Sequence, residues 1–199
     1  MMSAYVAPAG SFRPIDTPRL HLRPYAEQDA ELVHAMMSDP EVMRYYPSLY
    51  DLERARALIA WVGKSVESYG YSFWAVERKG DSLYLGHVGL LHWDDVDARE
   101  DVEVAYMLRR EHWGYGYATE AAQICRDWAF AHTVADRVVS FIDVNNAPSI
   151  GVAQRNGMTC LRRLDQNRFD RPVYVYGISR ERWTTLTVGE SARDWRAAT

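Results

Sequence analysis

Residues 102–122 read Val-Glu-Val-Ala-Tyr-Met-Leu-Arg-Arg-Glu-His-Trp-Gly-Tyr-Gly-Tyr-Ala-Thr-Glu-Ala-Ala. Apolar residues alternate with others from Val102 to Leu108, which is the period of a β-strand. From Ala118 onward, small and apolar residues return every three or four positions, as they do on one face of a helix. The stretch therefore predicts a strand, a turn with two glycines, and a helix that begins directly after the turn.

The two glycines of this turn favour a site for an anion. Gly114 and Gly116 lack a Cβ atom, so their backbone can adopt unusual dihedral angles and approach a ligand closely. The N–H groups of a first helical turn have no partner within the helix and lie at the positive end of its dipole. We interpret the turn as a phosphate site. The alternative is a plain tight turn in which the glycines serve only the backbone.

Two common phosphate loops fit this turn poorly. A nucleoside-triphosphate P-loop ends in Gly-Lys-Ser or Gly-Lys-Thr, and the turn contains no lysine. A dinucleotide-binding fingerprint would have a third glycine where Thr119 stands. A nucleotide-binding domain is therefore a weak alternative.

Residues 112–121 resemble the acetyl-CoA pyrophosphate loop of the GNAT N-acetyltransferases. Within that superfamily they are most similar to the Trp-Gly-x-Gly-Tyr-Ala-Thr-Glu-Ala form of the ribosomal-protein N-acetyltransferase (RimJ/RimL-type) branch. Residues 17–24 and 38–43 also resemble that branch, and the resemblance covers roughly residues 15–183. The chain departs from the superfamily pattern at Glu111, where a glutamine or arginine is usual.

Composition is that of a single ordinary domain. The chain has 199 residues, of which 48% are hydrophobic, and a formal net charge of −4. This charge gives no general attraction to nucleic acid or to an anionic membrane, and no apolar run is long enough to span a bilayer. The N-terminus does not read as a secretory signal, so we expect a cytoplasmic protein. We expect Cys125 and Cys160 to be buried thiols, and the spacing of the six histidines indicates no metal site.

The order of elements predicts an α/β (α+β) domain with a mixed sheet. The expected strands span residues 20–24, 72–77, 83–93, 102–108, 137–144, 159–164 and 172–178. The expected helices span residues 29–37, 39–45, 51–69, 117–132 and 148–156. Gly86 and Gly89 indicate a bulge or a close approach of backbone within their strand. The resemblance implies a GNAT fold, a single domain whose sheet of about six to seven strands is flanked by helices and splayed at its centre. We divide the chain into a flexible arm (1–14), the domain (15–183) and a tail (184–199).

The resemblance also implies a reaction, in which an amine attacks the thioester of acetyl-CoA. An α-amine, with a pKa of ~7.7–8.0, needs about 0.5 kcal/mol to be neutral near pH 7.4, whereas lysine needs about 4 kcal/mol. An N-terminal amine therefore requires little help from a base. Glu103 matches a glutamate of the family and is the candidate base; alternatively it continues the solvated acidic stretch of residues 94–101. The backbone N–H of Met107 or Leu108 would polarise the thioester carbonyl.

Further site residues follow from the same resemblance. Asn146 and Ser149 match the family's Asn-x-x-Ser, in which the asparagine contacts the pantetheine arm and the serine can protonate the leaving thiolate. Asn146 also reads as a helix N-cap, with Pro148 in the first turn. Many members use a tyrosine as the acid, and Ala153 stands at that position here. The residues expected to bind acetyl-CoA are Met107, Leu108, Trp113, Gly114, Tyr115, Gly116, Tyr117, Ala118, Asn146 and Ser149.

We therefore expect an acetyl-CoA-dependent N-acetyltransferase that needs no metal. Its acceptor would be a primary amine, either a protein or peptide N-terminus or a small molecule such as a polyamine, an antibiotic or an amino acid. Tyr45, Tyr46, Tyr50 and Trp61 belong to segments that line the acceptor site in this family, and we expect one or two of them to touch substrate. A CoA-binding sensor without turnover is the alternative of a different class. The protein would be a monomer or a homodimer.

Overall fold

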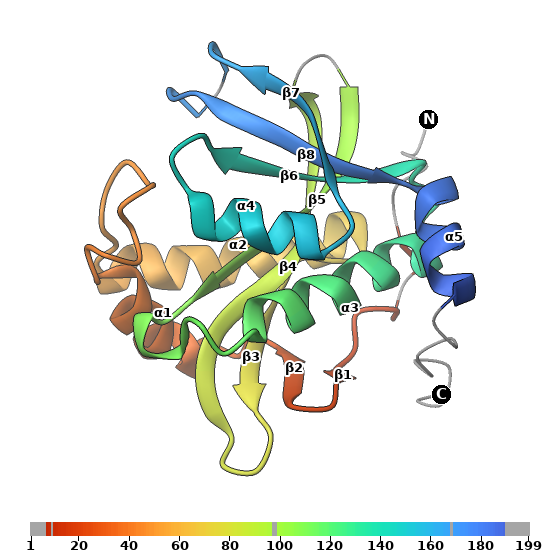
Figure 1. Ribbon diagram of the computed structural model, residues 1–199. Coiled ribbons are helices and arrows are strands. Elements are labelled where there is room, and N and C mark those ends of the chain that lie inside the picture. Colours follow the sequence, from red (N-terminus) through yellow and green to blue (C-terminus); the bar gives the residue numbers. More distant parts are fainter. Residues whose placement is uncertain (1–6, 9, 97–98, 168, 190–199) are drawn as a thin grey trace.

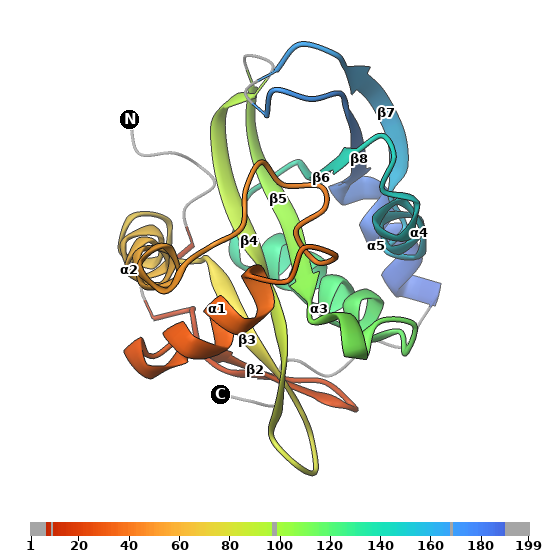
Figure 2. The same ribbon diagram turned by 90° about the vertical axis from the view of Figure 1, so that its left-hand side faces the viewer.

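The computed structural model describes residues 7–8, 10–96, 99–167 and 169–189. Eight strands form one sheet in the order β1-β2-β3-β4-β5-β6-β8-β7. The strands are β1 (Ile15–Asp16), β2 (Leu20–Pro24), β3 (Phe73–Arg78), β4 (Leu83–Val96), β5 (Arg99–Leu108), β6 (Arg137–Asp143), β7 (Thr159–Leu164) and β8 (Val173–Ser179). The helices are α1 (Ala30–Met37), α2 (Leu52–Tyr69), α3 (Tyr117–His132), α4 (Ala147–Arg155) and α5 (Arg180–Gly189). Helices α1 and α2 cover one face of the sheet, and α3 and α4 lie on the other (Figures 1 and 2).

The first five strands pair in chain order, each antiparallel to the next. They form the meander of the sheet. The expected bulge lies where β3 meets β4, because Val76 pairs with Gly86 but Glu77 pairs with Tyr84. Gly86 has φ +146°, and a Cβ atom there would lie only 2.2 Å from the carbonyl oxygen of Met107. Only glycine therefore allows β5 to approach β4 this closely.

Strands β5 and β6 are joined at one end only. They run parallel and pair at two positions, Val102 with Val138 and Glu103 with Val139. Next to these pairs, both oxygens of the buried Asp101 accept hydrogen bonds from Arg137, each 2.6 Å long. Beyond Glu103 no ladder pairing is present between the two strands. The splayed sheet that the resemblance implies is thus confirmed, and Asp101 is an internal anchor rather than part of a solvated stretch.

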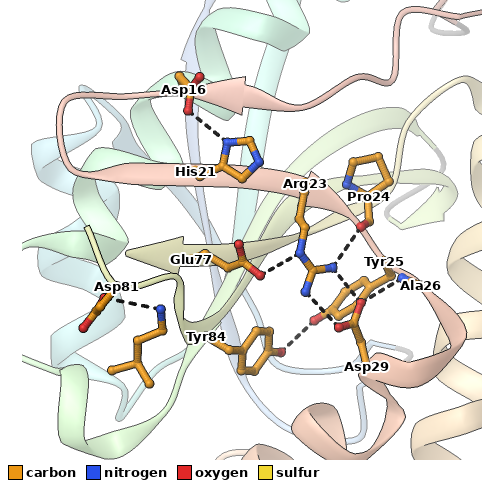
Figure 3. A network of polar contacts seen from close by, with 11 residues as sticks. Asp16, His21, Arg23, Pro24, Tyr25, Ala26, Asp29, Glu77, Asp81 and Tyr84 are labelled. Carbon is orange, nitrogen blue, oxygen red and sulfur yellow. Dashed lines mark hydrogen bonds and ion pairs between the residues drawn. The ribbon is translucent and has the colours of Figure 1, made fainter. Parts of the chain in front are cut away.

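A polar network fixes the start of α1 against the meander (Figure 3). The guanidinium of Arg23 donates to Glu77 (2.7 Å) and, through two nitrogens, to Asp29 (2.7 and 2.8 Å). Burial raises the pKa of Asp29, but the hydrogen bonds from Arg23 and from the Ala26 N–H, together with the Arg23 charge, outweigh it and leave that pKa below its ordinary value. On the same face, Met107 of β5 packs in an apolar cluster with residues of α1 and of the segment after it, among them Met36 and Val42.

Several expectations from the sequence need correction. The sheet has eight strands because the two-residue β1 adds an edge to the seven expected ones. The short helix expected at residues 39–45 is a set of turns, in which the Asp39 carboxylate accepts from the Glu41 N–H (2.8 Å) and so closes a local turn instead of capping a helix. Cys160 is exposed because β7 is the last strand of the sheet, whereas Cys125 is buried as expected.

The described residues at the two ends of the chain show how it enters and leaves the domain. The described part of the arm is packed against the domain: Ala7 is buried and donates to the Tyr69 carbonyl (2.8 Å), and Phe12 packs on Trp74 with ring centres 4.3 Å apart. These contacts arise because the arm carries apolar residues that cover the edge of the core. Helix α5 runs from Arg180 to Gly189 and so continues through the boundary drawn at 183.

Candidate active site

The turn between β5 and α3 has the backbone that its glycines predict. Gly114 has φ +83°, and Gly116, which is the N-cap of α3, has φ +81°. L-residues avoid this left-handed region, so glycine is required at both positions for conformational reasons. A Cβ atom at Gly114 would meet nothing within 4 Å, which means that open space lies beside the turn. The first intrahelical bond runs from the Glu120 N–H to the Gly116 carbonyl (3.1 Å), so the preceding N–H groups of α3 are left for a ligand.

The turn is held from the side by the segment before β2. Glu120 of α3 accepts hydrogen bonds from the Thr17 hydroxyl (2.6 Å) and from the Arg19 side chain (2.6 Å). Arg19 also donates to the Tyr115 carbonyl (2.9 Å). Two of the three segments that carry the family resemblance, residues 17–24 and 112–121, therefore form one hydrogen-bonded unit.

A cleft of about 510 Å³ extends from this turn along the opening between β5 and α4. Nine of the ten residues expected to bind acetyl-CoA line it: Met107, Leu108, Trp113, Gly114, Gly116, Tyr117, Ala118, Asn146 and Ser149. Tyr115 is not among the lining residues. Its side chain is 63% exposed and stacks on Tyr117. The sequence analysis did not name Arg155 at the cleft wall, whose Nε donates to the Thr119 hydroxyl (3.1 Å).

Backbone directions along β5 decide which amides face the opening. The Val104 carbonyl points toward β6, where it accepts from the Ser140 hydroxyl (2.6 Å), and the Arg109 N–H points toward β4, where it donates to the Leu85 carbonyl (2.8 Å). Because successive backbone groups of a strand point to opposite sides, the N–H of Leu108 faces the opening and that of Met107 faces β4. Of the two expected donors to a thioester carbonyl, this alternation favours Leu108.

Asn146 is the N-cap of α4, as its position predicts. Its side-chain oxygen accepts from the Ser149 N–H at 3.2 Å. The Ser149 carbonyl in turn accepts from the Tyr106 hydroxyl (2.9 Å), which ties β5 to α4 across the opening. Ala153 is buried at 1% exposure in the core, so no side chain from that position reaches the cleft. A tyrosine hydroxyl at this part of the opening comes instead from Tyr106 of β5, a residue that the sequence does not mark out as functional.

Glu103 lies beyond the cleft, in a separate recess of about 60 Å³ between β5 and β6. It is only 7% exposed, and its two carboxylate oxygens accept from the indole N–H of Trp93 (2.7 Å) and from the backbone N–H of Phe141 (3.2 Å). Burial raises the pKa of Glu103 from 4.5 to about 7, although both hydrogen bonds oppose this shift. The carboxyl is therefore poised to exchange a proton near neutral pH, and it is not a solvated continuation of the acidic stretch.

The recess and the cleft share one wall. Five residues line both hollows, namely Tyr45, Tyr46, Tyr106, Asn146 and Ser149. Tyr45 and Tyr46 come from the segment between α1 and α2, which crosses in front of β5 (Figure 2) and is held to the α4 side by a hydrogen bond from Tyr45 to the Asn145 carbonyl (3.0 Å). Tyr50 and Trp61 line neither hollow.

In the described part of the chain, no cluster of three or more histidine, cysteine or acidic side chains is arranged to hold a metal ion. None of the described helices is both long and apolar enough to cross a membrane.

Comparison with protein families places residues 19–159 in the acetyltransferase (GNAT) domain family. Protein YkkB of Bacillus subtilis (strain 168) is 34% identical over 161 residues, which are 80% of this chain and 92% of YkkB. The N-acetyltransferase p20 of Bacillus licheniformis is 32% identical over 137 residues, which are 67% of this chain and 75% of p20.

Solved structures agree with this assignment. An acetyltransferase from Agrobacterium tumefaciens str. C58 is 27% identical with a TM-score of 0.72, and the match covers 83% of this chain and 93% of that one. Two structures, each 16% identical with a TM-score of 0.68, share the fold. They are the ribosomal L7/L12 α-N-protein acetyltransferase RimL in complex with coenzyme A, matched over 84% of this chain and 98% of that one, and spermidine N-acetyltransferase from Vibrio cholerae in complex with CoA and spermine, matched over 84% and 99%.

Proposed function

The chain belongs to the GNAT acetyltransferase family, and on that premise we propose that it transfers an acetyl group from acetyl-CoA to a primary amine. The acceptor is a peptide or protein N-terminus or a small-molecule amine. The observation that carries the proposal is the path from the glycine turn along the cleft to the wall that the cleft shares with the recess of Glu103, whose carboxyl group is ionisable. Residues 17–24 and 112–121, which resemble the RimJ/RimL-type branch, form the hydrogen-bonded unit at the start of that path.

The binding half of the proposal rests on groups that suit a pyrophosphate. The turn offers backbone N–H groups at the positive end of α3, glycines that allow close approach, and open space beside Gly114. Asn146 and Ser149 line the cleft between this turn and Glu103, where a pantetheine arm would lie. The N–H of Leu108 faces the same opening and would donate to the thioester oxygen as negative charge develops there.

The chemical half assigns a proton to each group. The neutral amine nitrogen forms a bond to the carbonyl carbon and loses a proton to Glu103, and the carbon–sulfur bond breaks. The departing thiolate takes up a proton, for which the Ser149 hydroxyl is the proposed donor; solvent then returns a proton to Ser149 and removes the one on Glu103. A thiol has a pKa of ~8.5, so protonation of the thiolate needs little assistance. Glu103 must be ionised to act as the base. With a pKa of about 7 it is partly ionised at neutral pH, and it is also basic enough to take a proton there.

The test combines binding with turnover in one sample. Acetyl-CoA is titrated by calorimetry with ATP and NADH as comparators, and release of free thiol is then followed with a panel of amines. We expect acetyl-CoA to bind with micromolar affinity and ATP and NADH not to bind. We also expect thiol release to depend on the amine. Binding without release for any amine would favour a CoA-binding sensor and overturn the catalytic proposal. Absence of binding would overturn the assignment of the turn at Gly114 and Gly116.

A further inference from the structure

The recess around Glu103 contains three charged side chains. Glu103 of β5 and Asp143 of β6 are carboxylates, and Arg171, just before β8, is a guanidinium. All three line the recess together with Tyr46, whose ring centre lies 5.5 Å from the guanidinium carbon of Arg171. An acceptor that reaches Glu103 therefore meets one positive group and one further negative group.

The two carboxylates are not equally available. Asp143 Oδ1 accepts from the backbone N–H of Asn145 (2.9 Å) and from its side-chain amide (3.2 Å), and Asp143 Oδ2 lies 3.6 Å from Arg171. Asp143 is thus already hydrogen-bonded within the turn that connects β6 to α4. Glu103 accepts only N–H groups that hold it in place, and it is the carboxylate left to meet an amine.

Arg171 is less well satisfied than Asp143. Its Nε atom is buried and has no hydrogen-bond partner among the described residues, and the contact with Asp143 at 3.6 Å is longer than a hydrogen bond. A buried donor that lacks an acceptor is costly, and a ligand that supplies the acceptor gains the corresponding free energy. The N–H groups of a planar guanidinium match the oxygens of a carboxylate or a phosphate, and of these two the carboxylate is the one that an amine-bearing acceptor can carry next to its amine.

The size of the recess limits what can enter. A hollow of about 60 Å³ has room for only a few water molecules. It can therefore take the end of an acceptor that carries the amine and its immediate neighbours, while the rest of a larger molecule must stay outside.

From these contacts we propose that the acceptor is an α-amino acid, whose amine meets Glu103 while its α-carboxylate binds Arg171. This proposal rests on the proposed acetyl transfer and narrows it. The α-carbon places the two groups next to each other, as Glu103 and Arg171 line the same small recess. A polyamine would bring a second cation toward Arg171, and a peptide N-terminus carries a neutral carbonyl in place of the carboxylate.

The test compares three acceptors in wild type and in Arg171→Met. L-Alanine has both groups, L-alaninamide keeps the amine but loses the anion, and ethylamine lacks the carboxyl carbon. For each enzyme the ratio of kcat/KM for L-alanine to that for L-alaninamide is measured by thiol release. Dividing the wild-type ratio by the variant ratio cancels the different basicities of the two amines. A charged hydrogen bond that is lost should give a quotient of at least about 10.

A control variant removes the same charge elsewhere. Arg163 lies on β7 and pairs with Asp165 (2.7 Å) outside the recess, so Arg163→Met should leave the quotient near 1. A cooperative denaturant transition and a far-UV circular dichroism spectrum like that of wild type verify that Arg171→Met folds. Calorimetric titration of L-alanine into the CoA-bound enzyme supplies a second readout and should show weaker binding in Arg171→Met.

The outcomes separate the two proposals. Thiol release with other amines, but a quotient near 1 for Arg171→Met, overturns the role of Arg171 and leaves the acetyl transfer intact. A wild-type preference for spermidine or for the N-terminus of an alanine peptide over L-alanine also overturns it, in favour of those acceptors. Absence of thiol release with every amine overturns the acetyl transfer on which this inference rests.

Discussion

The two ends of β5 carry sites of opposite construction. At its C-terminal end, the turn before α3 presents backbone N–H groups, and the side chains nearby serve to hold the backbone in place. Nearer its N-terminal end, the recess depends on side chains, with Glu103 from β5 and Arg171 from the segment before β8. Glu103 is held there by the indole N–H of Trp93 from β4 and by the backbone N–H of Phe141 from β6. The first site depends on conformation, and the second depends on which distant segments meet.

This difference determines how each site responds to change. A backbone site tolerates many side chains but no Cβ atom at its left-handed positions. A side-chain site loses its chemistry when one functional group is removed, even if the fold is unaffected. The two proposed half-functions, binding and proton transfer, should therefore be separable by mutation.

Glu103→Gln should give the largest effect, because it removes the proposed base and leaves the turn untouched. We expect kcat/KM at neutral pH to fall by about 10²- to 10³-fold. In the wild type, kcat/KM should fall as the pH drops below about 7, since Glu103 is then protonated. The affinity for acetyl-CoA, measured by calorimetry, should stay within about twofold of wild type. A matching loss of affinity would contradict the separation of the two sites.

The same variant should become relatively more stable as the pH rises. The pKa of Glu103 is about 7 in the folded protein and 4.5 ordinarily, so the unfolded chain gives up this proton first. The difference between the two pKa values therefore stabilises the folded wild type fully below pH 4.5, and this stabilisation is lost as the pH rises to 7. Between about pH 4 and pH 8, the free energy of unfolding of Glu103→Gln should gain on the order of 3 kcal/mol relative to wild type. Denaturant titrations of both proteins at both pH values measure these free energies of unfolding. The same difference between variant and wild type at both pH values would contradict the prediction.

Gly114→Ala should do the reverse and weaken binding while the recess stays intact. A left-handed L-residue costs roughly 1–2 kcal/mol, so we expect the affinity for acetyl-CoA to fall about tenfold. The matched control is Gly63→Ala in the exposed middle of α2, where a Cβ atom meets nothing within 4 Å. That change should leave affinity unchanged and raise the unfolding free energy by about 0.5–1 kcal/mol. If both variants bind equally well, the turn at Gly114 is not the binding site.

Trp93→Phe should give the smallest effect and acts on the position and charge of Glu103. Phenylalanine keeps an aromatic ring against Phe141 and Phe169 but removes the indole N–H that stabilises the carboxylate. The pKa of Glu103 should rise further, so the acidic limb of the kcat/KM profile moves to higher pH and activity at pH 7 falls a few-fold. Wild-type activity should return at high pH. An unmoved limb would mean that Glu103 does not set it.

The same contrast explains what could be predicted from the sequence. The strand, glycine turn and helix at residues 102–122 are contiguous, and local conformational rules suffice to recognise them. The seven longer strands and the splayed sheet followed from periodicity and resemblance, whereas the two-residue β1 is too short to have a period. The resemblance identifies Glu103 as the candidate base. It does not reveal the hydrogen bonds from Trp93 and Phe141 that oppose the rise of its pKa, because those residues lie on neighbouring strands.

Other features could not be found because their partners are distant in the chain. Asp101 reads as one more acid in an acidic stretch, and only the pairing of β5 with β6 brings Arg137 to it. Arg171 stands in a polar segment with no pattern, so nothing local distinguishes it from Arg163. Tyr106 alternates like any other residue of its strand, and its hydroxyl gains meaning only because α4 lies across the opening.

The one-ended joining of β5 to β6 has a consequence for amide exchange with solvent. The N–H groups of Tyr106 and Leu108 face the opening, where the β5–β6 pairing has ended, while those of Ala105 and Met107 point toward β4. Deuterium should therefore enter β5 at every second amide beyond Glu103, and quickly. A molecule lying in the cleft would act as the missing strand, and the alternation along β5 would fade in proportion to its occupancy.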